Sequence, residues 1–265
     1  MNKKYLLLPV VMVVVGTLVV AGLYFFTPTL GEEKPKTAGK KPKIAVVNVK
    51  GTIENFETSH EVSKLARDNS VEAVALEINS PGGYVSPSFQ LEKAISELSR
   101  RKPTVAIVDR LGASGAYLAA SAADNLYVHH SSLVGSTGVM AVWTSLENYY
   151  QQKGIKHYVF TTGEHKDMFA PWRGPTENEK KMIRDQIYEI KDRMISTIAR
   201  NRASLENNMP RSVVAGEVVR GFRAVEMGLA DNTLMTDQAA VRKAAEAAGL
   251  SKEEYKVVEA SSLVE

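Results

Sequence analysis

The sequence contains no cysteine among its 265 residues. This absence excludes disulfide bonds, thiolate metal sites and a cysteine nucleophile. A large excess of charge is also missing, because 33 basic residues against 30 acidic ones leave a net charge of +3, which gives no argument for a nucleic-acid partner. The five histidines lie outside any recognisable triad context, and no set of residues has metal-ligand spacing. We therefore expect neither a metal nor another cofactor.

Charged residues are absent from residues 5–26, a run that follows Lys3 and Lys4. As a helix, this run is long enough to cross a hydrocarbon core of about 30 Å. A cleaved signal peptide is the alternative, but the run exceeds the usual length of a signal core and no small-x-small cleavage site directly follows it. We therefore expect residues 1–26 to be a transmembrane anchor. The basic flank favours a cytoplasmic N-terminus in the cell membrane, with the rest of the chain on the extracytoplasmic side.

The remaining chain divides into a linker, one domain and a tail. Residues 27–43 are rich in proline, glycine and lysine, which predicts a flexible linker. Strand and helix patterns then alternate, which predicts an α/β domain with a largely parallel sheet at 44–248 and a C-terminal tail at 249–265. We expect strands at 43–53, 71–78, 104–109, 125–130 and 156–163, and helices at 60–69, 89–101, 115–124 and 237–248.

A capping box, Thr176-Glu177-Asn178-Glu179, predicts the start of a further, long helix. Apolar residues recur behind it at helical spacing, which extends the predicted helix to about Ala203. Such a stripe is more often a core face than a cofactor or membrane face.

Two glycine-containing turns follow neighbouring predicted strands. They are Ser80-Pro81-Gly82-Gly83 and Gly112-Ala113-Ser114-Gly115. Glycines directly after a strand permit an unusual backbone and the close approach of a ligand, and ligand sites in open α/β folds gather at the carboxyl ends of strands. Ser114 opens a helix of small residues, where its hydroxyl could serve as an N-cap or as a nucleophile. In the second case the N–H groups of Gly83 and Gly115 could bind an oxyanion.

A lysine could be the general base that activates such a nucleophile. Lys166 lies in GEHKDMFAPWRGPT, a loop rich in proline and aromatic residues. A lysine acts as a general base only where burial or neighbouring cations favour its neutral form. A surface lysine paired with Asp167 is the alternative interpretation of this residue.

In this order, the segments NSPGG, GASGAYLAASAAD, GSTGV and GEHKDMFAPWRGPTENE resemble the signal peptide peptidase A family of serine proteases. These are membrane-anchored members of the Clp protease/crotonase superfamily, so the resemblance, over roughly residues 43–232, implies a repeated β-β-α fold. It implies a serine–lysine dyad with Ser114 as the nucleophile and Lys166 as the general base. It also implies that Gly83 and Gly115 are the oxyanion donors and that Ser136 is a hydroxyl partner of the lysine amine.

The sequence departs from the family pattern after the nucleophile turn, where Ala116 and Leu118 stand in a segment that often reads SGGYY in the family. This change should alter the shape of the pocket rather than the chemistry. The family also has long forms with two tandem domains, whereas this chain resembles a short, single-domain form. Short forms build closed homo-oligomeric rings whose neighbours contribute to each site. Ser114 and Lys166 are therefore expected to meet either within one subunit or across an interface of such a ring.

The function implied by this resemblance is that of a membrane-anchored serine endopeptidase that hydrolyses remnant signal peptides or other apolar membrane-associated peptides. A membrane-bound Clp-class protease that cuts a hydrophobic segment of a partner membrane protein is the nearest alternative. A crotonase-type acyl-CoA enzyme would leave the anchor, Ser114 and Lys166 unexplained. A non-catalytic membrane scaffold is a third interpretation, in which a serine-reactive probe would leave Ser114 unmodified.

Overall fold

The computed structural model describes residues 41–206, 208–234, 236–252 and 254–263. The chain from Lys41 onward forms one compact unit. The predicted anchor at 1–26 and most of the predicted linker at 27–43 lie outside the described residues. Within the described part of the chain, no helix has the length and apolar character needed to cross a membrane.

The centre of this unit is a sheet that, over the described residues, has eight strands in the order β6-β5-β3-β2-β1-β8, with β4 beside β3 and β7 beside β4. All of its strand pairs are parallel except β5 with β6, which confirms the largely parallel sheet expected from the sequence. The strands are β1 (Lys43–Lys50), β2 (Val71–Ser80), β3 (Thr104–Ala113), β4 (Asn125–Val128), β5 (Leu133–Gly135), β6 (Val218–Arg220), β7 (Asn232–Thr233) and β8 (Lys256–Glu259).

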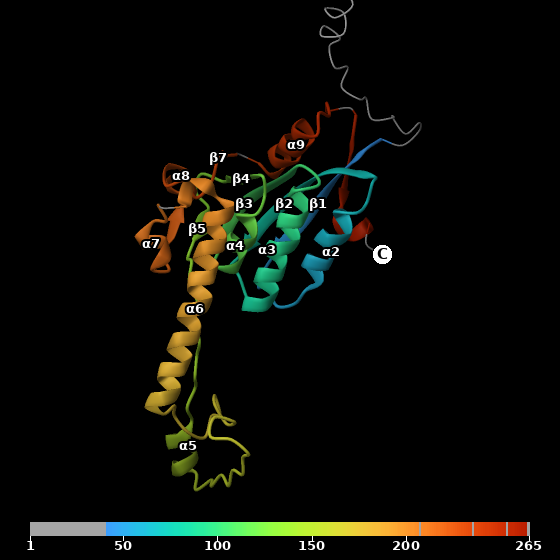
Figure 1. Cartoon of the computed structure of the whole chain (residues 1–265). Helices are drawn as coiled ribbons and strands as arrows, with labels where there is room; N and C mark the ends of the chain where they lie inside the picture. The colour runs from blue at the N-terminus through green and yellow to red at the C-terminus, as the bar shows by residue number, and fades with distance from the viewer. Residues whose placement is uncertain (1–40, 207, 235, 253, 264–265) are drawn as a thin grey trace, which may run out of the picture. The chain divides into compact units, whose positions relative to one another are not determined.

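Helices cover both faces of this sheet (Figure 1). Helices α2 (Glu57–Leu65), α3 (Val85–Ser99) and α4 (Gly115–Ala120) pack against one face, and α9 (Asp237–Ala247) packs against the other. Because side chains alternate along a strand, β1 sends its residues into two separate cores. Val47 lies in the first core and Val46 in the second. Burial on both faces explains why β2 and β3 read as nearly continuous apolar runs.

The long helix α6 (Glu177–Asn201) begins at the predicted capping box and ends close to the predicted boundary. The Thr176 side chain accepts a hydrogen bond from the Glu179 N–H at 3.2 Å, and the Glu179 carboxylate accepts one from the Thr176 N–H at 2.9 Å. The last turns of α6 are buried against the body of the fold, whereas its first half runs away from the sheet (Figure 1). The remaining helices are α5 (Glu147–Gln152), α7 (Arg211–Val214), α8 (Gly221–Glu226) and the 3-10 helices η2 (Ala203–Leu205) and η3 (Ala260–Leu263).

Residues 138–193, which we call the arm, make up α5, its flanking segments and the first half of α6. Among these residues, all of which the structure describes, only Ala170 and Glu179 are buried. Figure 1 shows α5 beside the N-terminal end of α6, beyond the body of the fold. The arm is therefore held mainly by contacts among its own residues.

The arm contains the clearest error of the sequence prediction. The strand expected at 156–163 does not form. Its β-branched and aromatic residues have no neighbouring strand to pair with, and Tyr158 and Phe160 are 79% and 94% exposed. Residues of high β-propensity form a strand only where the fold supplies a sheet edge.

Several other boundaries differ from the prediction by a few residues, and two of the differences change the description of the fold. Helix α3 begins at Val85 rather than near residue 89, because Pro87 falls within the first turn, where proline is tolerated. The segment expected to be a tail at 249–265 contains β8, which pairs with β1 in parallel. The sheet therefore continues past the boundary expected at residue 248.

Candidate active site

Ser114 stands directly after β3, and its backbone conformation is unusual. Its φ of 53° and ψ of −124° place a non-glycine residue in a region that costs about 1–3 kcal/mol. The Ser114 N–H donates a hydrogen bond to the Gly135 carbonyl at 2.8 Å, which helps to hold this turn. Although Ser114 occupies the N-cap position of α4, its side chain makes no capping hydrogen bond. The structure therefore argues against the simple N-cap interpretation and leaves the hydroxyl free to react.

The turn after β2 packs directly on the turn after β3, as expected from their places at adjacent strand ends. A Cβ on Gly82 would lie 2.7 Å from the Gly115 nitrogen, and a Cβ on Gly83 would lie 2.2 Å from the Ile53 carbonyl oxygen. Only glycine permits this close approach of two backbones. The Gly83 nitrogen lies 3.6 Å from the position that a Cβ of Gly115 would take.

Two backbone donors beside Ser114 are left without partners. Gly115 is the first residue of α4, so its N–H has no acceptor inside the helix. In the other turn, Tyr84 donates to the Ile53 carbonyl and Gly82 donates to the Ser80 hydroxyl. Neither the Gly83 N–H nor the Gly115 N–H donates to any residue that the structure describes. Paired free donors of this kind are what an oxyanion hole requires.

If the Gly115 N–H binds an oxyanion, Gly115→Ala is expected to lower kcat by about 10²–10³-fold with little change in KM, because the new Cβ would displace this N–H group. That Cβ would lie 2.1 Å from the Ser88 Oγ and 2.6 Å from the Ser88 Cβ, and Ser88 is only 3% exposed on α3. Steady-state kinetics on a fluorogenic peptide measure the loss. Adding Ser88→Gly should restore part of it by making room. Wild-type kcat in the single variant would show that the Gly115 N–H is not needed.

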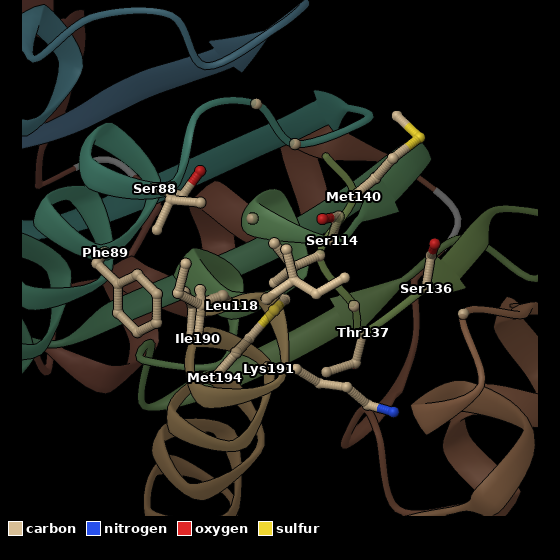
Figure 2. Close-up of a pocket in the computed structure, with 18 of the residues that line it drawn as sticks. Ser88, Phe89, Ser114, Leu118, Ser136, Thr137, Met140, Ile190, Lys191 and Met194 are labelled. Atoms are coloured by element: carbon tan, nitrogen blue, oxygen red, sulfur yellow. The ribbon is translucent and has the colours of Figure 1, made fainter. Parts of the chain in front are cut away.

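Ser114 opens into a groove of about 770 Å³ between the two turns and α6. The apolar side chains of Leu118, Ile190, Met194, Phe89 and Met140 line this groove (Figure 2). The groove is therefore largely apolar near the serine. Its charged lining residues are Arg184 and Lys191, both from α6. All five histidines lie in the described part of the chain, and none of them lines the groove.

The opposite wall of the groove carries two hydroxyl groups after β5. Ser136 has a φ of 52°, and its N–H donates to the Glu217 carbonyl at 2.7 Å. Thr137 is fully buried, and its Oγ1 has no hydrogen-bond partner among the described residues. Ser136 thus faces the same groove as Ser114, as the resemblance implies, and Thr137 is a lining residue that the sequence analysis did not single out.

Lys166 lies elsewhere, in the arm. It is exposed and does not line the groove, and its amine has no hydrogen bond or ion pair to a described residue. The expected alternative partner, Asp167, is bonded instead to Arg173. The adjacent His165 lies 3.7 Å from Glu179 in the first turn of α6. The groove is lined on α6 by residues between Arg184 and Met194, and Glu179 lies before all of them on the helix. The structure therefore does not bring Lys166 to Ser114 within one chain.

Lys191 is the lysine that does line the groove, and the sequence analysis missed it. It lies three residues before the buried Met194 on the apolar stripe of α6, which is the signal that could have placed it there. Its amine lies over the ring of Tyr188, 5.8 Å from the centroid. Figure 2 shows this amine directed away from the Ser114 hydroxyl. Its position makes Lys191 the natural comparison for any test of Lys166.

Comparison with known proteins gives matches over most of the α/β domain. The sequence profile of Peptidase family S49 matches residues 96–251. A protein of Methanocaldococcus jannaschii named as a candidate protease is 34% identical over 193 residues, which cover 72% of this chain and 60% of that protein. A candidate signal peptide peptidase SppA of Enterococcus faecium is 25% identical over 226 residues, or 79% of this chain and 65% of that protein. Protease 4 of Haemophilus influenzae is 29% identical over 202 residues, or 71% of this chain and 32% of that protein.

Proposed function

Since the chain belongs to peptidase family S49, the family of signal peptide peptidase A, we propose that it is a serine endopeptidase with Ser114 as its nucleophile and Lys166 as its general base. One observation carries the proposal. Ser114 has a strained backbone and a free hydroxyl, and it stands beside two unpartnered N–H groups at the mouth of an apolar groove. Strained residues cluster at active sites because strain there serves preorganisation.

In the proposed reaction, the neutral Lys166 amine takes the proton of the Ser114 hydroxyl as Oγ attacks the scissile carbonyl carbon. The N–H groups of Gly83 and Gly115 bind the resulting oxyanion, and one such donor is typically worth about 2.7–4 kcal/mol. The C–N bond then breaks, and the lysine returns the proton to the leaving amine. Water hydrolyses the ester on Ser114 and restores the free hydroxyl.

A second copy of the chain is the proposed source of the base. Within one chain, Lys166 lies exposed in the arm and does not line the groove into which Ser114 opens. The arm exposes large apolar side chains such as Val142, Tyr158 and Phe160, which suit burial against another subunit. We propose a homo-oligomeric ring in which the arm of one subunit delivers Lys166 to the groove of its neighbour. Ser136 is the proposed hydroxyl partner of the delivered amine.

The side chains that line the groove also indicate which class of substrate it would bind. Its walls near Ser114 are formed by Leu118, Ile190 and Met194, and no acidic residue lines it among those that the structure describes. An apolar wall favours small or hydrophobic substrate side chains. It also favours the neutral form of a buried amine, which a lysine base requires. We propose that the substrates are remnant signal peptides or other apolar peptides, cleaved beside the cell membrane on its extracytoplasmic side.

A fluorophosphonate probe tests this function directly, because such a probe reacts with an activated serine. We expect peptide mass spectrometry to find the adduct on Ser114, and we expect hydrolysis of an apolar fluorogenic peptide to fall in proportion to labelling. Hydrolysis that persists in fully labelled protein would rule out Ser114 as the nucleophile. A protein that neither reacts with the probe nor cleaves peptides, although it assembles, would instead be a scaffold.

A further inference from the structure

The proposed mechanism leaves one charged cluster of the arm without a role. Arg173 lies between the carboxylates of Asp167 and Glu179 and uses all five of its N–H donors. Nε and Nη2 donate to Asp167 at 2.9 and 2.7 Å, and Nη1 and Nη2 donate to Glu179 at 2.7 Å each. The fifth donor bonds the Gly174 carbonyl at 3.0 Å. We call these three side chains the arginine cluster.

The arginine cluster is shielded from solvent and strongly charged. The side chains of Arg173, Asp167 and Glu179 are 25%, 18% and 1% exposed. Hydrogen bonds from Arg173 lower the pKa of Glu179 to about 2, and they also lower the pKa of Asp167. Both carboxylates therefore remain ionised at neutral pH, where charge-assisted bidentate bonds are among the strongest in proteins.

The arginine cluster also ties two distant parts of the arm together. Trp143 stacks under the Arg173 guanidinium, whose carbon lies 5.2 Å from the ring centroid. The Trp143 indole N–H reaches the carbonyls of Ala170 and Arg173 at 3.2 and 3.1 Å. Because Glu179 also closes the capping box of α6, the loop before the helix is fixed to the helix itself. The position of this loop along α6 is thereby set.

Lys166 stands between two residues that contact the arginine cluster. Asp167, directly after it, belongs to the cluster, and the ring nitrogen of His165, directly before it, lies 3.7 Å from Glu179. The Lys166 N–H donates to the Gly163 carbonyl at 3.2 Å, which closes the turn. With both neighbours turned towards the interior of the arm, the Lys166 side chain is the one left exposed. The backbone of Lys166 is held while its amine is presented outward.

We propose that Arg173 is a positioning residue for Lys166, fixing through Asp167 and Glu179 the point at which the arm presents this amine. The proposal rests on the proposed function, in which Lys166 is the base. A dyad whose members come from two chains gains no alignment from a shared backbone. Its alignment depends on the rigidity of each half, and a displacement of about 1 Å can cost 10²-fold in rate. The arginine cluster supplies that rigidity to the segment of the arm that carries Lys166.

A double-mutant cycle tests this inference with the wild-type chain, Arg173→Lys, Lys166→Ala and the double variant. Lysine keeps the charge but has three donors and no planar fork, so at least two of the five hydrogen bonds are lost. We expect Arg173→Lys to lower kcat about 10- to 100-fold with KM within about twofold. In the Lys166→Ala background it should lower kcat no further. An activated ester keeps hydrolysis measurable without the base.

The controls separate positioning from a general effect on structure. Arg223→Lys changes an exposed arginine that pairs with Glu226, and it should leave kcat unchanged. Size-exclusion chromatography shows whether each variant assembles as the wild type does. If Arg173→Lys does not assemble, Asp167→Asn takes its place in the same cycle. This substitution weakens the bonds between Arg173 and Asp167 in the loop and keeps the bonds between Arg173 and Glu179.

Each remaining outcome overturns the inference in a recognisable way. An equal fall in kcat in both backgrounds would show that Arg173 supports the fold rather than acting through Lys166. Full activity of Arg173→Lys with loss of activity in Lys166→Ala would reject the positioning role and keep the dyad. Full activity of Lys166→Ala would reject the base, and the positioning role would fall with it.

Discussion

Replacing Ser114 with alanine is expected to lower kcat for peptide hydrolysis by about 10³-fold or more, because it removes the hydroxyl that lies beside the free N–H groups of Gly83 and Gly115 and is proposed to form the acyl intermediate. Alanine keeps the Cβ, so the backbone strain at φ 53° and the stability of the fold should be unchanged. Fluorogenic peptide hydrolysis measures the loss, and thermal unfolding verifies that the fold is intact. Labelling by a fluorophosphonate should disappear in parallel.

Ser114→Gly is the matched control for this prediction. Glycine adopts positive φ without strain, so this variant should be more stable than Ser114→Ala by about 1 kcal/mol, or about 2–4 °C in Tm. It should be equally inactive. Such a result would show that the chain gives up stability at this residue for the sake of its hydroxyl. Wild-type kcat in either variant would contradict the assignment of Ser114.

Removal of the Lys166 amine has the second large expected effect. Lys166→Ala should lower kcat about 10²–10⁴-fold, the usual worth of a general base, and should leave KM nearly unchanged because a general base acts on proton transfer rather than on substrate binding. Lys191→Met is the comparison, since it removes the amine that does line the groove and keeps an apolar side chain of similar length. We expect it to alter KM rather than kcat. Loss of kcat in Lys191→Met, with full activity in Lys166→Ala, would move the base into the same chain as Ser114.

The sheet and the two turns could be predicted because their signals are local. Uninterrupted apolar runs indicated the buried strands, and the two turns lie together because neighbouring parallel strands end at the same edge. Glycine at 82, 83 and 115 indicated a need for close backbone approach, and the structure shows that Ile53 and Ser88 leave no room for a Cβ at Gly83 and Gly115. The signal peptide peptidase A family was likewise predicted from the motifs, and the match to peptidase family S49 confirms it.

The part of the arm before α6 could not be predicted, because its conformation depends on contacts that no local pattern encodes. The segment 156–163 has the β-branched and aromatic residues of a strand, yet the arm offers it no edge with which to pair. The distance between Lys166 and the groove follows from the direction of α6, which tertiary packing near Met194 decides. The partners of Arg173 lie six residues before and six residues after it, a spacing that matches neither helix nor strand periodicity.

The most direct test of the whole account mixes two inactive chains, Ser114→Ala and Lys166→Ala, co-expressed with different tags and purified through both. If each site takes Ser114 from one subunit and Lys166 from another, about a quarter of the sites in randomly mixed rings hold both residues, and peptide hydrolysis should return to about that fraction of the wild-type rate. Each variant alone should remain inactive. Doubly tagged oligomers without activity would contradict the account, because they would show that Lys166 of one subunit does not serve Ser114 of another.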